Sequence, residues 1–203
     1  MKGLILYGDS IFFGYGASDR SLGCGRLLKK NLPVPTLIKA RNHITSQFAL
    51  ENIGNIVFRD DIHGYSHVLV LFGNNDSVLI DNDTPSVYPE DYSDNLTEIV
   101  RTIKKNGMQC CLCNLQPLNE KIFFQTQEKV CKLMRDIKSP YEWQKKYSDI
   151  CIEVSKSESV PLIDIRTPLE NRGDNIFFQD GMHPNDAGHY VVFETIYSQI
   201  KNL

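Results

Sequence analysis

The sequence has no excess of positive charge and no long apolar run. Its 22 Lys and Arg residues are outnumbered by 25 Asp and Glu residues, which gives a formal net charge of −3. Without a basic field to attract a phosphate backbone, we expect no nucleic-acid partner. No stretch approaches the ~20 consecutive apolar residues that a membrane-spanning helix needs, so we expect no integral membrane association.

Cysteine is too scarce for a disulfide scaffold, and no leader segment is visible. Of the six cysteines, Cys110, Cys111 and Cys113 fall in one apolar stretch without the CxxC spacing of zinc sites. This pattern favours buried free thiols in a reducing compartment, and we expect no bound metal. The first seven residues are too short for a signal peptide and are expected to form a strand. We therefore expect a cytoplasmic protein.

The composition is that of an ordinary globular protein, with 41% hydrophobic and 23% charged residues. A chain of 203 residues has the length of one domain, and it contains no linker-like tract or internal repeat, so we expect one domain over residues 1–203. Short apolar runs bounded by turn residues predict parallel strands covered on both faces. These runs fall at residues 3–7, 36–40, 67–72, 108–115 and 160–165.

Helical patterns lie between these runs. Over residues 92–105, apolar side chains recur at steps of three and four, and Asp91 or Ser93 is the expected N-cap. A last helix is expected from about Asn185, where Pro184 suits the helix entry. Alternating strands and helices predict an α/β fold with three layers (αβα) and a flavodoxin-like five-stranded parallel sheet of order 2-1-3-4-5. In that order strands 1 and 3 are neighbours, and ligands bind beyond their carboxyl ends.

Polar motifs follow these two strands and precede the last helix. Gly-Asp-Ser occupies residues 8–10, Gly-Asn-Asn-Asp residues 73–76, and Asp-Gly-Met-His-Pro residues 180–184. Each motif alone is compatible with an ordinary turn. Together they supply the parts of an ester hydrolase: a hydroxyl nucleophile, a base, an acid that orients the base, and donors for the oxyanion.

The third motif fits a base and its orienting acid. Asp180 and His183 lie three apart around a glycine, so a carboxylate oxygen can reach Nδ1 of His183 and leave Nε2 facing a hydroxyl. Ser10 is then the candidate nucleophile, and Asn75 offers a side-chain amide to the developing oxyanion. Asp186 is a competing acid, although a carboxylate is also favourable in the first turn of a helix.

The three motifs, in this order, resemble the GDSL/SGNH hydrolase family over nearly the whole chain. The family's blocks read GDS, usually followed by Leu, then GxND and DGxHP, and this chain has matching residues at 8–11, 73–76 and 180–185. The resemblance implies Ser10 as nucleophile, His183 as general base and Asp180 as its partner. It also implies that Asn75 and the backbone N–H of Ser10 are oxyanion donors.

The family's second block is matched imperfectly. Its oxyanion glycine follows strand 2 in a pattern such as N-x-G-x-x-G-x-T, whereas residues 41–48 here read Arg-Asn-His-Ile-Thr-Ser-Gln-Phe. This alignment puts Ser46 at the glycine position, and its N–H is expected to serve as a donor unless the loop requires a positive φ. Gly54 lies further on, where we expect a helix C-cap.

Other polar residues are interpreted as structural. Asp9 and Asp76 belong to the matched motifs and are expected to organise their loops by hydrogen bonding. His63 and His67 lie four apart, but a strand begins at once, so they do not share a helix face as paired metal ligands would.

Two stretches around the expected cleft are open to more than one interpretation. Phe123, Phe124 and Trp143 lie between strands 4 and 5, where they suit a lid or acyl pocket, although core packing is commoner. The acidic stretch at residues 77–91 is expected to be mostly a solvated loop. If it rims the cleft, strongly anionic substrates are disfavoured.

The leading hypothesis is cofactor-free, serine-dependent hydrolysis of carboxylic esters through an acyl-enzyme. The expected substrate is a small-molecule ester, such as a short-chain acyl or acetyl ester of a small molecule or carbohydrate, and lysophospholipase or thioesterase activity is the alternative. Two other classes stay open. One is a metal-dependent phosphoesterase, which needs histidines that the first strand end lacks, and the other is a binding module without turnover. The sequence indicates no oligomeric state.

Overall fold

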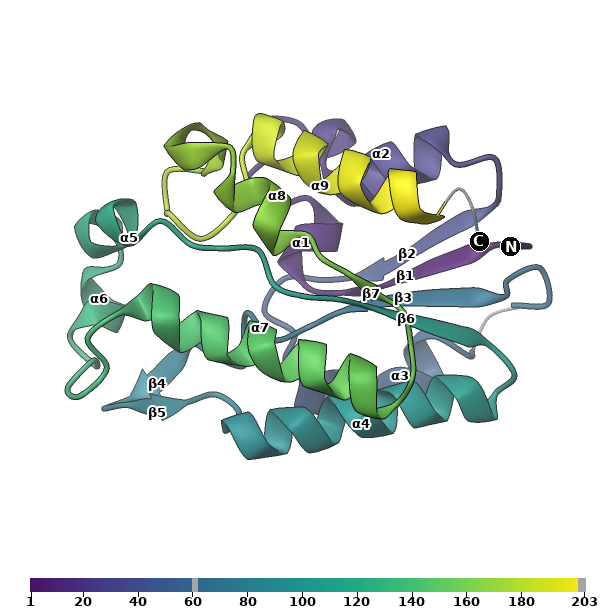
Figure 1. Ribbon diagram of the computed structural model, residues 1–203, viewed down its shortest axis with the longest axis horizontal. Coiled ribbons are helices and arrows are strands. Elements are labelled where there is room, and N and C mark those ends of the chain that lie inside the picture. The colour runs from purple at the N-terminus through teal and green to yellow at the C-terminus, as the bar shows by residue number, and fades with distance from the viewer. Residues whose placement is uncertain (60–61, 201–203) are drawn as a thin grey trace.

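The computed structural model describes residues 1–59 and 62–200. Its main sheet has five parallel strands in the order β2-β1-β3-β6-β7, which is the predicted order 2-1-3-4-5. Helices cover both faces of this sheet, so the predicted three-layer α/β fold is confirmed (Figure 1). The strands are β1 (Leu4–Gly8), β2 (Thr36–Ala40), β3 (His67–Leu71), β6 (Gln109–Cys113) and β7 (Leu162–Ile163).

The three strands nearest the site end level with one another. Gly8 at the end of β1 pairs with Ala40 of β2 and with Leu71 of β3. All five residues of β1 are buried, as expected of an apolar strand covered on both faces. The loops that follow these strands therefore start from one edge of the sheet, which is where the sequence motifs lie.

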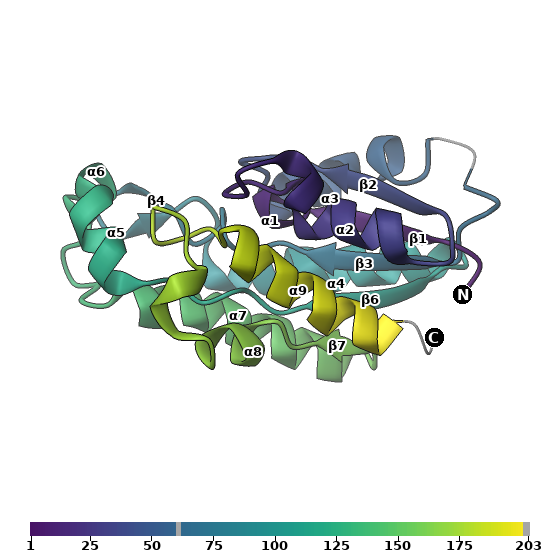
Figure 2. The same cartoon turned by 90° about the horizontal axis from the view of Figure 1, so that it is seen from above.

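Two layers of helices enclose the sheet (Figures 1 and 2). The apolar stripe predicted over residues 92–105 is buried on α4 (Pro89–Lys105), from Tyr92 to Ile103. One layer holds α1 (Ser10–Phe13), α2 (Cys24–Asn31), α8 (Arg166–Glu170) and α9 (Asp186–Ile200), with the 3-10 helices η1 (Arg20–Leu22) and η2 (Gly173–Ile176). The other holds α3 (Ser46–Ile56), α4 (Pro89–Lys105) and α7 (Pro140–Ser157).

Several predicted element ends were wrong. Neither Asp91 nor Ser93 caps α4, because this helix starts earlier, with Pro89 in its first turn, where a missing N–H costs nothing. Gly54 is not a C-cap, because α3 continues through it to Ile56, and the C-cap is Val57, which has right-handed backbone. The fifth strand is also shorter than the predicted residues 160–165.

One part of the fold lies beyond the carboxyl ends of the strands, and the sequence suggested it only as one alternative, a lid or acyl pocket between strands 4 and 5. We call it the cap, and it consists of residues 77–87 and 118–143. Figures 1 and 2 place its elements at the end of the molecule opposite both termini. The acidic stretch predicted as a loop thus contains a hairpin. The cap elements are β4 (Leu79–Asp81), β5 (Thr84–Pro85), α5 (Glu120–Thr126), α6 (Glu128–Cys131) and the start of α7.

Two sequence predictions concern the cysteines, expected to be free thiols, and the absence of membrane-spanning segments. All six cysteines lie in the described part of the chain and are free, five of them buried and Cys131 half-buried. Across residues 1–59 and 62–200, none of the helices has both the length and the apolar character needed to cross a membrane.

Candidate active site

Ser10, His183 and Asp180 meet in space as the motifs predicted. Ser10 is the first residue of α1, directly beyond β1, and its Oγ lies 2.9 Å from Nε2 of His183, which is 173 positions away in the chain. On the other side of the ring, Nδ1 of His183 lies 2.7 Å from Oδ2 of Asp180. Because the carboxylate accepts only, Nδ1 carries the hydrogen and Nε2 is left to accept the Ser10 hydroxyl proton.

A tight turn presents Asp180 and His183 to the site. Oδ1 of Asp180 accepts the backbone N–H groups of Met182 and His183 at 2.9 and 3.0 Å, which fixes the carboxylate within its own turn. Gly181 has φ of +73°, and a Cβ there would lie 2.7 Å from the backbone nitrogen of Phe123, so only glycine suits this position. Burial acts to raise the pKa of Asp180, but the hydrogen bonds and charge of His183 outweigh it, so that the pKa lies below its ordinary value.

The competing acid is engaged elsewhere. Both carboxylate oxygens of Asp186 accept hydrogen bonds from Ser18, one from its backbone N–H at 2.7 Å and one from its hydroxyl at 2.6 Å. The ring of His183 instead packs against Tyr15, with ring centroids 4.5 Å apart. Asp180 is therefore the carboxylate in position to orient His183.

Two buried aspartates organise the motif loops, as expected. Asp9 accepts the N–H of Ile11 at 3.0 Å and the side-chain amide of Asn74 at 2.9 Å, which ties the first motif to the second. Asp76 accepts both the N–H and the hydroxyl of Ser46, the latter at 2.5 Å. Burial raises the pKa of Asp9 and of Asp76 to about 6, although their hydrogen bonds act in the opposite direction.

Ser46 does not reach the cavity, so the prediction that it fills the oxyanion position was wrong. Its N–H and its hydroxyl both face Asp76, and the residue is fully buried at the start of α3. As the first residue of α3, Ser46 turns its N–H toward Asp76 and away from the cavity. In the loop at residues 41–45 the left-handed conformation falls at His43, whose φ is +61°, and His43 lines the cavity together with Asn42.

Asn75 does line the cavity with Ser10. Its Nδ2 donates one hydrogen bond to the carbonyl of Ile44 at 2.9 Å, which leaves the second amide hydrogen for another acceptor. The glycine that opens this loop, Gly73, has φ of +130°, and a Cβ there would lie 2.8 Å from the hydroxyl of Tyr92. The loop is therefore held close to the end of β3, next to the end of β1.

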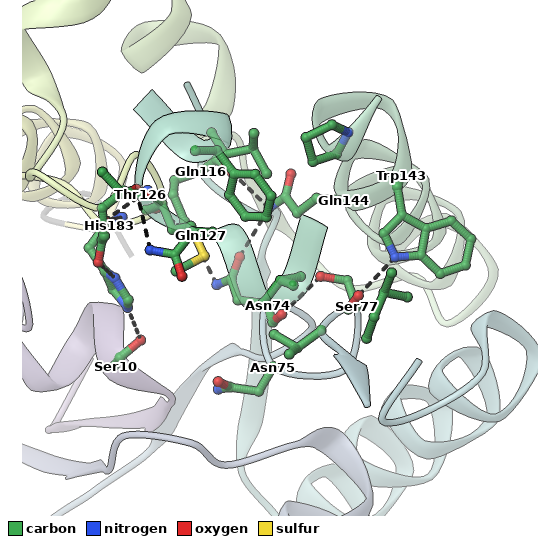
Figure 3. Close-up of a pocket in the computed structure, with 18 of the residues that line it drawn as sticks. Ser10, Asn74, Asn75, Ser77, Gln116, Thr126, Gln127, Trp143, Gln144 and His183 are labelled. Carbon is green, nitrogen blue, oxygen red and sulfur yellow. Dashed lines mark hydrogen bonds and ion pairs between the residues drawn. The ribbon is translucent and has the colours of Figure 1, made fainter. Parts of the chain in front are cut away.

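The cavity extends from the triad into the cap and has a volume of about 650 Å³. Figure 3 shows Ser10 and His183 on one side and Trp143 on the opposite side, with Asn74 and Gln116 between them. Polar side chains line the end near Ser10. The other end, toward Trp143, is mainly apolar although Ser77 and Gln144 lie beside that ring (Figure 3). Its apolar lining comes from Leu79, Val130, Met134, Ile137, Pro140 and Trp143.

A buried amide network missed from the sequence supports the polar end. Gln116, just beyond β6, donates to the carbonyl of Met182 at 3.2 Å and accepts from Asn74 at 3.1 Å. Gln144 of α7 donates to Oδ1 of Asn74 at 3.0 Å and accepts from the buried Arg166 at 2.8 Å. The order of the strands indicated that the loop after β6 adjoins the site, but no motif marked these residues.

The chain matches the model of the GDSL-like lipase/acylhydrolase family over residues 6–191. It belongs to this family. The match covers all three motifs, and with them the predicted class of enzyme, a GDSL-type hydrolase, is confirmed.

Several curated relatives of this GDSL-family chain carry the same family name. It is 28% identical over 162 residues to the GDSL esterase/lipase WDL1 of rice, and the match covers 77% of this chain but only 61% of the rice protein. It is 26% identical to the GDSL esterase/lipase CPRD49 of Arabidopsis thaliana, with 98% of this chain and 78% of the relative covered.

Solved structures share the fold of the GDSL-family chain. A lipase/acylhydrolase from Enterococcus faecalis superposes with a TM-score of 0.78 at 20% identity, covering 100% of this chain and 96% of the other. The psychrotrophic esterase EstA from Pseudoalteromonas, solved with the inhibitor monoethylphosphonate, gives a TM-score of 0.73 at 17% identity, covering 100% and 98%. At these identities the likeness shows the fold.

His63 and His67, the pair considered as metal ligands, lie away from the triad. His67 begins β3, at the edge of the sheet opposite the motifs, and its Nδ1 lies 2.8 Å from the hydroxyl of Ser66. His63 is exposed in the loop before β3. Within the described residues, no three His, Cys, Asp or Glu side chains are grouped so as to hold a metal ion.

Proposed function

We propose that this chain hydrolyses carboxylic esters through an acyl-enzyme formed on Ser10. The observation that carries this proposal is the continuous chain from Ser10 Oγ to His183 Nε2, at 2.9 Å, and from His183 Nδ1 to Asp180 Oδ2, at 2.7 Å. Such a chain lets the imidazole take the hydroxyl proton while the carboxylate stabilises the imidazolium that results.

The reaction proceeds in two halves. Ser10 Oγ attacks the ester carbonyl as its proton passes to Nε2 of His183, and the imidazolium then protonates the departing alcohol, which leaves an acyl group on Ser10. Water enters, gives a proton to His183 and attacks the acyl carbonyl, and the carboxylic acid leaves as Ser10 recovers its proton. Asp180 stays ionised throughout, which its lowered pKa favours.

The proposed oxyanion donors are the free amide hydrogen of Asn75 and backbone N–H groups beside it. Candidates are the N–H of Ser10 and those of the loop around His43, where the left-handed residue lies on the cavity wall. Donors fixed in a partly buried site stabilise the tetrahedral intermediate without reorganising as charge develops.

The substrate expected from the sequence is a short-chain acyl or acetyl ester of a small molecule or carbohydrate. The polar end of the cavity fits such a group against Ser10. The apolar end offers few partners to sugar hydroxyls, and it favours aliphatic acyl esters over acetylated carbohydrates. Lysophospholipase or thioesterase activity is the second candidate, because the substrates of both activities carry longer acyl chains that suit the same apolar end.

Replacement of the nucleophile tests the proposal. We expect Ser10→Ala to lower kcat for p-nitrophenyl acetate by about 10⁴-fold or more, since the triad acts as a unit, while circular dichroism and the melting temperature stay close to those of the wild type. Unchanged turnover in a folded Ser10→Ala protein would refute the proposal.

Two controls separate the other classes. Full activity in the presence of EDTA is expected and would remove a metal-dependent phosphoesterase, whereas loss of activity that added metal restores would favour it. A wild-type protein that binds esters but turns none over would favour the binding module.

A further inference from the structure

The apolar end of the cavity is built from two separate pieces of the cap. Leu79 comes from the hairpin β4–β5, whereas Met134 and Ile137 come from the link between α6 and α7. Neither piece belongs to the main sheet. The shape of this end therefore depends on what holds the hairpin and the link together.

One side chain at the tip of the hairpin makes most of that connection. Oδ1 of Asp83 accepts the backbone N–H groups of Arg135 at 2.9 Å and Ile137 at 3.3 Å, and Oδ2 accepts that of Asp136 at 2.9 Å. The N–H of Asp83 in turn donates to the carbonyl of Leu133 at 2.9 Å. We call these four bonds the clasp.

The clasp is built at some conformational cost. Asp83 has φ of +48°, a region that Asp and Asn tolerate better than most residues. The hydrogen bond from Asp136, together with those from Arg135 and Ile137, holds the pKa of Asp83 below its ordinary value, so the carboxylate is the form that closes the clasp.

The residues that the clasp fixes are those that face the cavity. Met134 and Ile137 line the apolar end, and each is adjacent to or part of the backbone that Asp83 binds. On the same side, Trp143 is tied to the start of the hairpin by a bond from its Nε1 to the carbonyl of Ser77 at 2.8 Å. Two links to the hairpin, one from residues 133–137 and one from Trp143, thus close the apolar end.

We propose that Asp83, by clasping the hairpin to the 133–137 link, closes the apolar end of the cavity and sets the length of acyl chain that fits. The role in substrate selection rests on the proposed ester hydrolysis. The ligand is the aliphatic acyl group of a substrate, extending from the carbonyl at Ser10 past Trp143 toward Met134. Asp83 touches no reacting atom and acts as a positioning residue.

Fatty-acid binding tests the proposal without turnover. Trp143 is the single tryptophan of the chain and lines the cavity, so its fluorescence reports occupation. In the full-length protein we expect affinity for saturated acids from acetate to decanoate to rise about fourfold for each methylene buried. The rise should stop at the length at which the chain meets the clasp.

Two variants and one control define the role of Asp83. Asp83→Gly removes all three side-chain bonds yet suits a positive φ, and we expect it to weaken binding of the longest well-bound acid at least tenfold and to abolish the length limit. Acetate binding should change less than twofold. Asp83→Asn, which keeps one acceptor oxygen, should give an intermediate profile and serves if the glycine variant does not fold. Asp81→Asn lies on the same hairpin, but its carboxylate accepts the N–H of its neighbour Asn82 and takes no part in the clasp, so this variant should match the wild type.

A parallel series of p-nitrophenyl esters separates this inference from the proposed function. We expect Asp83→Gly to raise KM for the long esters and to leave kcat for acetate unchanged. The proposed role of the clasp would be overturned if both Asp83 variants showed the same dependence of affinity on chain length as the wild type. It would also be overturned if wild-type affinity did not depend on chain length. If acids bind with the expected profile but no ester is hydrolysed, the clasp stands and the proposed function fails.

Discussion

The two ends of the cavity are built on different principles. At the catalytic end, each functional residue follows a strand or sits in a short turn, and Asp180 and His183 are oriented by bonds that span only three positions. At the cap end, the walls meet through bonds such as that between Asp83 and Arg135, which are 52 positions apart and have no sheet beneath them. The chemistry is therefore fixed by the sheet, whereas the pocket shape depends on a few contacts between loops.

This difference predicts which substitutions affect chemistry and which affect selectivity. Changes at the catalytic end should lower turnover for every ester by the same factor, because they act on the carbonyl. Changes in the cap should alter the ranking of esters by chain length and leave the smallest ester unaffected.

The largest effect in this comparison is expected for Asn75→Ala. Loss of one oxyanion donor costs about 3 kcal/mol of transition-state stabilisation, which is roughly a hundredfold in kcat. The loss should be equal for p-nitrophenyl acetate and octanoate, measured under saturating conditions with each. A loss below twofold would remove Asn75 from the site, and a loss that depends on chain length would contradict the separation of the two ends.

A smaller effect is expected in the pH dependence of the unfolding free energy, which should differ between Asp76 at the catalytic end and Asp83 in the cap. Burial raises the pKa of Asp76 in the folded chain to about 6, from its ordinary value of 3.8. Between about pH 4 and pH 6 the unfolded chain loses this proton while the folded chain keeps it. Asp76 therefore makes the free energy of unfolding fall as pH rises, by on the order of 2 kcal/mol across the window.

Urea denaturation of Asp76→Asn and the wild type measures this contribution as a difference. The unfolding free energy of the variant minus that of the wild type should rise from pH 4 to pH 6. His189, whose pKa burial lowers to about 4, contributes with the opposite sign and cancels in the difference. The pKa of Asp83 lies below its ordinary value of 3.8, so the wild type should keep its advantage over Asp83→Asn above about pH 4 and lose it only as the pH falls further. A difference that stays constant for Asp76→Asn would show that this carboxyl is not buried in its protonated form.

The sequence predicted the catalytic end well because its determinants are local. Apolar runs located the strands, and the strand order then brought residues 8–10 and 73–76 to one edge. The turn around Gly181 makes Asp180 and His183 partners whatever surrounds them. The prediction for Ser46 was wrong because a sequence motif does not reveal backbone angles, and the left-handed residue of this loop is His43.

The cap could not be predicted because its contacts leave no periodic or motif pattern. Nothing in the acidic stretch distinguishes Asp83, which accepts three N–H groups, from the exposed Asp81 two positions earlier. From the sequence, core packing was the commoner expectation for Trp143 and a pocket the alternative, and only the bond to Ser77 and the cavity decide between them.

Covalent labelling tests the central claim most directly. Treatment with an alkyl fluorophosphonate followed by peptide mass spectrometry should place a single phosphonyl group on Ser10, with no adduct in Ser10→Ala and slow labelling in His183→Ala. An unmodified Ser10 in the folded wild-type protein, or an adduct that persists in Ser10→Ala, would contradict the account.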